Sequence, residues 1–92
     1  MNTTPPTVTA ADDVRAILVA VADQLAAGPH YRILTEADRL ALILTEVTNR
    51  HGSGLPALNL DREVRRYAPA IDWEITRGEY ALIVRRAAGG AL

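Results

Sequence analysis

The stretch "IDWEITRGEYALIV", residues 71–84, decides the fold that this sequence predicts. Polar and apolar residues alternate on both sides of Arg77-Gly78, a pattern typical of two antiparallel strands joined by a tight turn. With that turn in place, the opposed residues on one face of the hairpin are all apolar: Ile71, Trp73, Ile75, Tyr80, Leu82 and Val84. We therefore expect a β-hairpin whose apolar face packs on the core, with Ile83 as the one apolar residue on the other face.

Two helices are expected upstream, because two threonines each precede an aspartate by three positions, as in a capping box. Thr9 and Thr35 are the expected N-caps, and apolar residues then recur at helical spacing over about residues 10–27 and 36–51. A glycine follows each stretch and favours the end of the helix there. Between the two helices, residues 30–34 (HYRIL) fit either a short strand or a loop.

A third, shorter helix is expected to carry three arginines. Asn59 is the expected N-cap, Pro69 ends the helix near Tyr67, and residues 52–58 form the preceding loop. The apolar residues at i, i+4 and i+7 form a stripe that faces inward: Leu60, Val64 and Tyr67. Off this stripe, and so on or beside the outer face, lie Arg62, Arg65 and Arg66.

The composition fits one small folded domain in a chain of 92 residues. We expect an α+β fold, three helices followed by a C-terminal antiparallel β-hairpin, over residues 9–87, with flexible tails at 1–8 and 88–92. All ten basic residues are arginine, but the formal net charge is -1, so nucleic-acid binding would need a local basic patch.

Several classes of chemistry lack the residues that they need. There is no cysteine, which excludes disulfides and thiolate nucleophiles. His30 and His51 do not have the spacing of a zinc site, and Ser53 does not have the glycine pattern of a nucleophile elbow. We expect no enzyme, no metal and no cofactor. No apolar run is long enough for a membrane span and the N-terminus has no signal-peptide pattern, so a cytoplasmic protein with no membrane partner is expected.

The predicted order of elements resembles that of a winged helix-turn-helix domain: helix, short strand, helix, helix, strand, tight turn, strand. The resemblance covers about residues 10–86 and rests on element order alone. It implies that the third helix enters the major groove of DNA and that the hairpin forms the wing. The implied DNA-binding residues are Arg62, Arg65 and Arg66 on the helix and Arg77 at the wing tip.

The leading hypothesis is therefore a non-catalytic regulator, or an accessory protein of a mobile element, that binds double-stranded DNA. The alternative is a protein–protein interaction module, homodimeric or adaptor-like, with no nucleic-acid binding. The alternative is favoured by the carboxylates of Asp61 and Glu63, which can pair with the arginines and leave them a solvated helix face. A second apolar surface could come from Val19, Leu42 and Ile83. A distant third reading is an endoribonuclease with acid–base groups at Glu79, Tyr80, Arg85 and Arg86.

Overall fold

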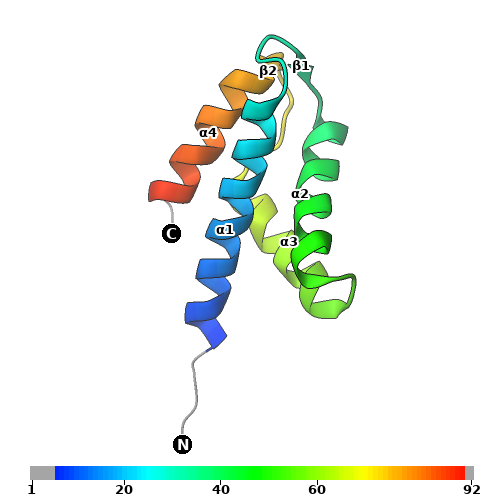
Figure 1. Ribbon diagram of the computed structural model, residues 1–92, viewed down its shortest axis with the longest axis vertical. Helices are drawn as coiled ribbons and strands as arrows, with labels where there is room; N and C mark the ends of the chain where they lie inside the picture. Colours follow the sequence, from blue (N-terminus) through cyan, green and yellow to red (C-terminus); the bar gives the residue numbers. More distant parts are fainter. Residues whose placement is uncertain (1–5, 91–92) are drawn as a thin grey trace, which may run out of the picture.

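The computed structural model describes residues 6–90, which form four helices and one small antiparallel sheet (Figure 1). The expected tail residues 1–5 and 91–92 lie outside the described part of the chain. The elements follow one another as α1 (Pro6–Ala27), β1 (Ile33–Leu34), α2 (Glu36–His51), α3 (Leu55–Tyr67), β2 (Ile75–Thr76) and α4 (Arg77–Gly90). None of the helices in residues 6–90 is long and apolar enough to cross a membrane.

The core surrounds α1. In Figure 1, α4 lies beside α1 and runs in the opposite direction, while α2 and α3 cover the other side. The apolar stripe predicted for α1 is buried along its whole length: Val14, Ile17, Leu18, Val21 and Leu25. Each fully buried aliphatic side chain contributes roughly 1.5–3 kcal/mol of hydrophobic stabilisation. The stripe therefore fixes which face of α1 the other helices cover.

The second helix has the predicted bounds and the predicted N-cap. Thr35 accepts a hydrogen bond from the backbone of Asp38, whose carboxylate accepts one in return from the backbone of Thr35, at 3.1 and 3.0 Å. At the other end, Gly52 has φ 77°, the left-handed region that favours glycine, and its N–H donates to Thr48 O. Residues 30–34 fitted either a short strand or a loop in the sequence, and the structure has a short strand at Ile33–Leu34.

The starts of α1 and α3 differ from the prediction. α1 begins at Pro6, so Thr9 lies inside the helix and is not its N-cap. α3 begins at Leu55 with Gly54 as N-cap, and the expected start at Asn59 is wrong by a full turn. Pro56 occupies the first turn of α3, where its missing N–H would have no helical partner in any case. The connection between α2 and α3 therefore shrinks to residues 52–54.

The predicted C-terminal hairpin is wrong, and with it the expected α+β, winged-helix-like fold of three helices followed by a hairpin. Ile75–Thr76 pairs with Ile33–Leu34 from the middle of the chain, and the second half of the predicted hairpin is the helix α4. One physical reason is tertiary, the pairing of Ile75–Thr76 with β1, and the other is local, a second capping box, at the start of α4. The N–H of Glu79 donates to Thr76 Oγ1 at 3.2 Å, and the N–H of Thr76 donates to Glu79 Oε1 at 2.9 Å. Arg77 thus begins a helix and does not occupy a turn.

The alternating pattern in this segment fits a strand and a helix alike. Tyr80 and Val84 are four residues apart, so they share a face in a strand and in a helix alike, and both are buried. Ala81 and Leu82 distinguish the two structures, because a strand would bury Leu82 and a helix buries Ala81. Ala81 is 5% exposed and Leu82 is 65% exposed, as the helix requires.

Candidate functional site

One side of α3 is turned to solvent and carries the three arginines singled out from the sequence. Its exposed residues, which we call the α3 outer face, are Leu55, Pro56, Leu58, Asn59, Arg62, Arg65 and Arg66. Leu55, Leu58 and Arg62 follow one another at i, i+3 and i+7 and so lie in one row. The two leucines are 69% and 51% exposed, which is high for large apolar side chains.

Two of the three arginines are held by carboxylates of their own helix. Arg65 Nη2 lies 2.8 Å from Asp61 Oδ2, and Arg66 Nη1 lies 3.3 Å from Glu63 Oε2. Arg62 is exposed and makes no ion pair within residues 6–90. Asp61 itself is buried, and its Oδ1 has no hydrogen-bond partner in the same part of the chain. The α3 outer face therefore presents one unpaired cation beside two neutralised ones.

The fourth predicted DNA-binding residue, Arg77, lies away from α3. Arg77 is the first residue of α4, so it does not lie at the tip of a β-hairpin wing. Its Nη2 donates to Gln24 O at 2.9 Å in the last turn of α1, where a cation favours the carbonyl end of the helix. Its guanidinium also packs over Gly28, where an added Cβ would come within 2.8 Å of it. Arg77 thus joins α4 to the end of α1.

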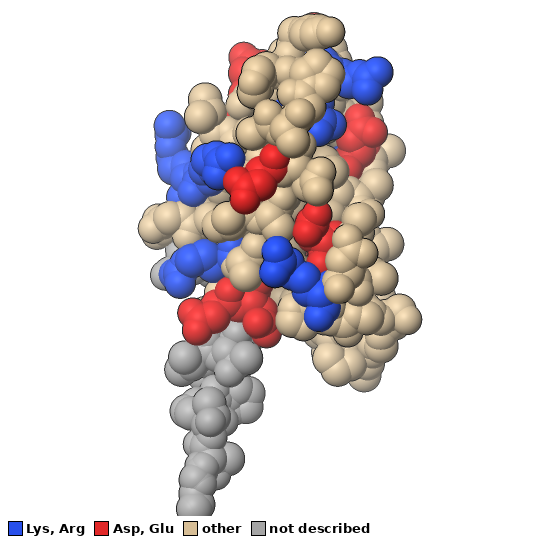
Figure 2. Space-filling view, viewed as in Figure 1, with Lys and Arg blue, Asp and Glu red and all other residues tan. Residues whose placement is uncertain are grey.

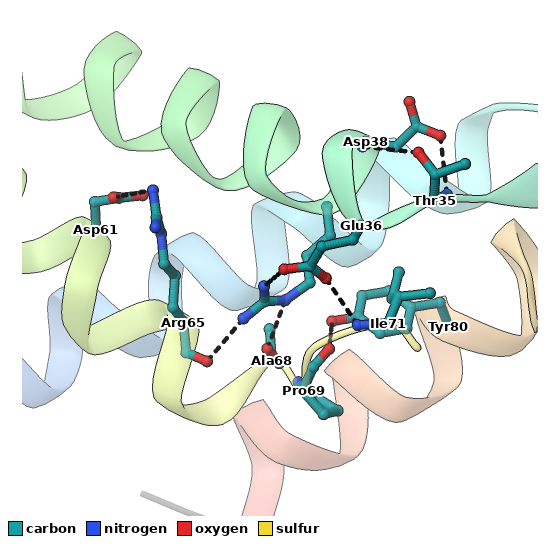
Figure 3. A network of polar contacts seen from close by, with 10 residues as sticks. Thr35, Glu36, Asp38, Asp61, Arg65, Ala68, Pro69, Ile71 and Tyr80 are labelled. Atoms are coloured by element: carbon teal, nitrogen blue, oxygen red, sulfur yellow. Dashed lines mark hydrogen bonds and ion pairs between the residues drawn. The ribbon is translucent and has the colours of Figure 1, made fainter. Parts of the chain in front are cut away.

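A buried arginine that the sequence did not single out fixes the C-terminal end of α3, and Figure 3 labels its partners Glu36, Arg65 and Ala68. Arg39 of α2 donates from Nε to Ala68 O at 2.9 Å and from Nη2 to Arg65 O at 3.1 Å. Its third nitrogen, Nη1, pairs with Glu36. The other oxygen of Glu36 accepts the N–H of Ile71 at 2.7 Å. A signal was present, because Arg39 precedes Ile43 and Val47 by four and eight residues and so shares their inward face.

Tyr80 completes this cluster from α4. Its hydroxyl donates to Pro69 O at 2.6 Å, just beyond the end of α3. Burial raises the pKa of Tyr80 to about 12, although the charge of Arg39 and a hydrogen bond with it act in the opposite direction. The side chain is therefore a neutral hydrogen-bond donor at physiological pH. It is engaged in the core, which argues against the acid–base role considered for it.

The second apolar surface expected from the sequence does not form as a unit. Leu42 and Ile83 pack against the core, and of the three residues only Val19 is exposed. Charge is also dispersed: on the face seen in Figure 2, arginines and acidic residues are interspersed without a continuous basic field. Within residues 6–90, no group of three or more His, Cys, Asp or Glu side chains could hold a metal ion.

No family model, curated protein or solved structure matches the chain. A functional proposal therefore depends on the geometry of its own residues, above all on the α3 outer face.

Proposed function

We propose that the chain is a non-catalytic protein-binding domain and that the α3 outer face is its binding surface. The observation that carries the proposal is the row of Leu55, Leu58 and Arg62 on the exposed side of one helix. Exposed apolar side chains beside arginine are the chemistry of protein interfaces, where arginine is enriched and buried anchors supply most of the affinity.

The back of α3 supports the proposal because it is held firmly. Val64 is fully buried against the core, and Arg39 binds two carbonyl groups at the end of the helix. A helix fixed in this way loses little conformational entropy when a partner binds, so more of the contact energy appears as affinity. The outer face is thus pre-organised for binding.

Protein binding is favoured over DNA binding by the residues at the start of α3. A recognition helix contacts base edges mainly with its N-terminal residues, which need hydrogen-bonding side chains. Here those positions hold Leu55, Pro56 and Leu58, and Asn59 is the first polar side chain. The formal net charge of -1 also gives little general attraction to phosphates.

DNA binding is retained as a second candidate because of one specific observation. α2 and α3 are joined by the three residues 52–54, which include two glycines, and this is the connection typical of a helix-turn-helix. This connection is shorter than the loop over residues 52–58 that the sequence predicts. Arg62, Arg65 and Arg66 are all exposed on the second helix of the pair.

Site-specific photo-crosslinking in the cells that produce the protein tests the proposal. A benzophenone amino acid replaces Leu58, 51% exposed, in one variant and Leu82, a leucine of α4 that is 65% exposed, in the matched control. We expect protein adducts from position 58 and none from position 82. Absence of adducts at position 58, or equal labelling at both positions, contradicts the proposal.

A gel shift at about 50 mM salt tests the second candidate, because phosphate contacts are strongest at low salt. The proposal of protein binding expects no retardation of a DNA duplex. Retardation that disappears when Arg62, Arg65 and Arg66 are all changed to alanine would replace it with DNA binding.

A further inference from the structure

Another exposed surface with apolar side chains, distinct from the α3 outer face, lies at the N-terminal end of α2. The start of α3 follows the opposite end of α2. This other surface is a shallow groove, the Trp73 groove, lined by β1, the first residues of α2 and the segment 71–74. Its exposed large apolar side chains are Ile33, 46% exposed, and Trp73, 44% exposed. A half-exposed tryptophan is the residue type most enriched among the anchors of protein interfaces.

The charge of the Trp73 groove is acidic. Its lining includes the carboxylates of Glu36, Asp72 and Glu74 and no basic residue. Glu36 is already bonded to Arg39 and to the backbone of Ile71. Asp72 and Glu74 are exposed, and neither makes an ion pair or a side-chain hydrogen bond within residues 6–90. The Trp73 groove therefore combines two unpaired carboxylates with exposed apolar surface, and it is complementary to a surface that carries both a cation and apolar side chains.

The α3 outer face has the complementary character. Leu55 and Leu58 supply apolar surface, and Arg62 supplies a cation without a carboxylate partner in the described part of the chain. A guanidinium can pair with a carboxylate through two parallel hydrogen bonds and can also stack on the face of an indole ring. The Trp73 groove and the α3 outer face of this chain are therefore complementary in charge and in apolar surface.

We propose that the Trp73 groove of one molecule binds the α3 outer face of a second copy of this chain. The inference rests on the proposed function, since it names the partner of the same surface. The 16 residues of α2, a rise of about 24 Å, separate the groove from Leu55 and Leu58 at the start of α3. One molecule can therefore use its groove and its outer face at the same time.

Such a contact joins two different surfaces, so two molecules either exchange both contacts in a closed two-fold dimer or leave one groove and one outer face free for further copies. Head-to-tail contacts of this kind build rings or open chains of molecules. The assembly should therefore grow with protein concentration. Trp73 is the single tryptophan of the sequence, so the blue shift of its fluorescence on desolvation reports occupation of the groove directly.

The test uses three variants of the full chain, all at exposed positions. Leu58→Glu places a carboxylate where the acidic groove would approach, and Asp72→Arg/Glu74→Arg reverses the charge of the groove. Leu82→Glu makes the same change as the first variant at an exposed leucine outside both surfaces. Circular dichroism establishes that each variant is folded, and Arg62→Glu replaces Leu58→Glu if that chain does not fold.

Analytical ultracentrifugation gives the expected result. The wild type and Leu82→Glu exceed the monomer mass of 9.9 kDa as concentration rises, with a blue shift of Trp73 emission. Leu58→Glu and the double variant bind at least about tenfold more weakly and remain monomers. An equimolar mixture of these two forms a complex of twice 9.9 kDa and nothing larger, because only one intact groove and one intact outer face remain.

Two results would overturn the inference. One is a wild type that stays monomeric at every concentration. The other is an assembly that neither the α3 variant nor the groove variant weakens. In both cases, protein adducts from position 58 that contain another polypeptide would leave the proposed function standing. Absence of such adducts would remove the proposed function as well.

Discussion

Arg39 is a charged side chain inside the core, and each of its three guanidinium nitrogens has a partner. A buried charge costs free energy unless its donors are satisfied, and here two of them bind carbonyl groups at the end of α3. The same cluster holds the segment that leads from α3 to the Trp73 groove, through Glu36 and Ile71. Arg39 therefore helps to position both proposed binding surfaces, the α3 outer face and the Trp73 groove.

We expect Arg39→Ala to lower the free energy of unfolding by about 2–4 kcal/mol, because it leaves buried carbonyl groups and Glu36 without their partner. Urea denaturation measures the change. Arg62→Ala is the control and should lie within about 0.5 kcal/mol of the wild type, since Arg62 is exposed. Equal effects of the two substitutions would contradict the role given to Arg39.

The raised pKa of Tyr80 predicts that the free energy of unfolding falls in strong base. Its pKa is raised from 10.0 to about 12 by burial, so the unfolded chain releases the phenolic proton before the folded chain does. The contribution of the neutral hydroxyl is complete below pH 10 and is lost as the pH rises to about 12. Denaturation curves across this range should show a decline for the wild type that Tyr80→Phe lacks. A parallel decline in both proteins would contradict the prediction.

At the scale of the elements, α2 and α4 begin with the same device. Thr35 with Asp38 and Thr76 with Glu79 each form a reciprocal capping box. Both patterns are visible in the sequence, but Arg77-Gly78 also fits a tight turn, and the alternation around it favoured that interpretation. The sequence therefore carried local signals for both a helix and a hairpin, and the alternation alone was not enough to choose correctly between them.

Thr76→Ala should lower the free energy of unfolding by about 1 kcal/mol, the usual cost of a lost N-cap. The backbone and side-chain hydrogen bonds of Thr76 hold the pKa of Glu79 below its ordinary value of 4.5. The substitution removes the side-chain bond and should raise that pKa towards 4.5, which an NMR titration measures. An unchanged pKa would show that the Thr76 hydroxyl does not donate to the carboxylate of Glu79.

At the scale of the whole molecule, the first and last helices of the described chain, α1 and α4, pack against each other. Arg15 Nε donates to Ala88 O at 3.1 Å, and Arg85 pairs with Asp23 at 3.0 Å. α4 also supplies Tyr80 and Val84 to the core around α1. α1 and α4 therefore depend on each other for burial, although most of the chain separates them.

A chain that stops at Thr76 should fail to fold cooperatively, because it leaves the buried face of α1 open on the side of α4. Thermal unfolding followed by circular dichroism would show a broad, non-cooperative change. A chain that ends at Gly90 is the control and should unfold like the full protein. A sharp transition in the shorter chain would mean that α4 is dispensable for the core.

The sequence by itself determined the features that depend on neighbours along the chain. These are the bounds of α2, the buried stripe of α1 and the end of α3 before Pro69, each set by capping, helical spacing or a missing backbone donor. Only the tertiary structure decided the state of residues 77–90. Tyr80 and Val84 satisfy both periodicities, so the choice depended on α1 burying Ala81 and on β1 pairing with β2. Contacts between distant segments also decided that Arg39 binds the carbonyl groups at the end of α3 and that Leu55 and Leu58 remain exposed.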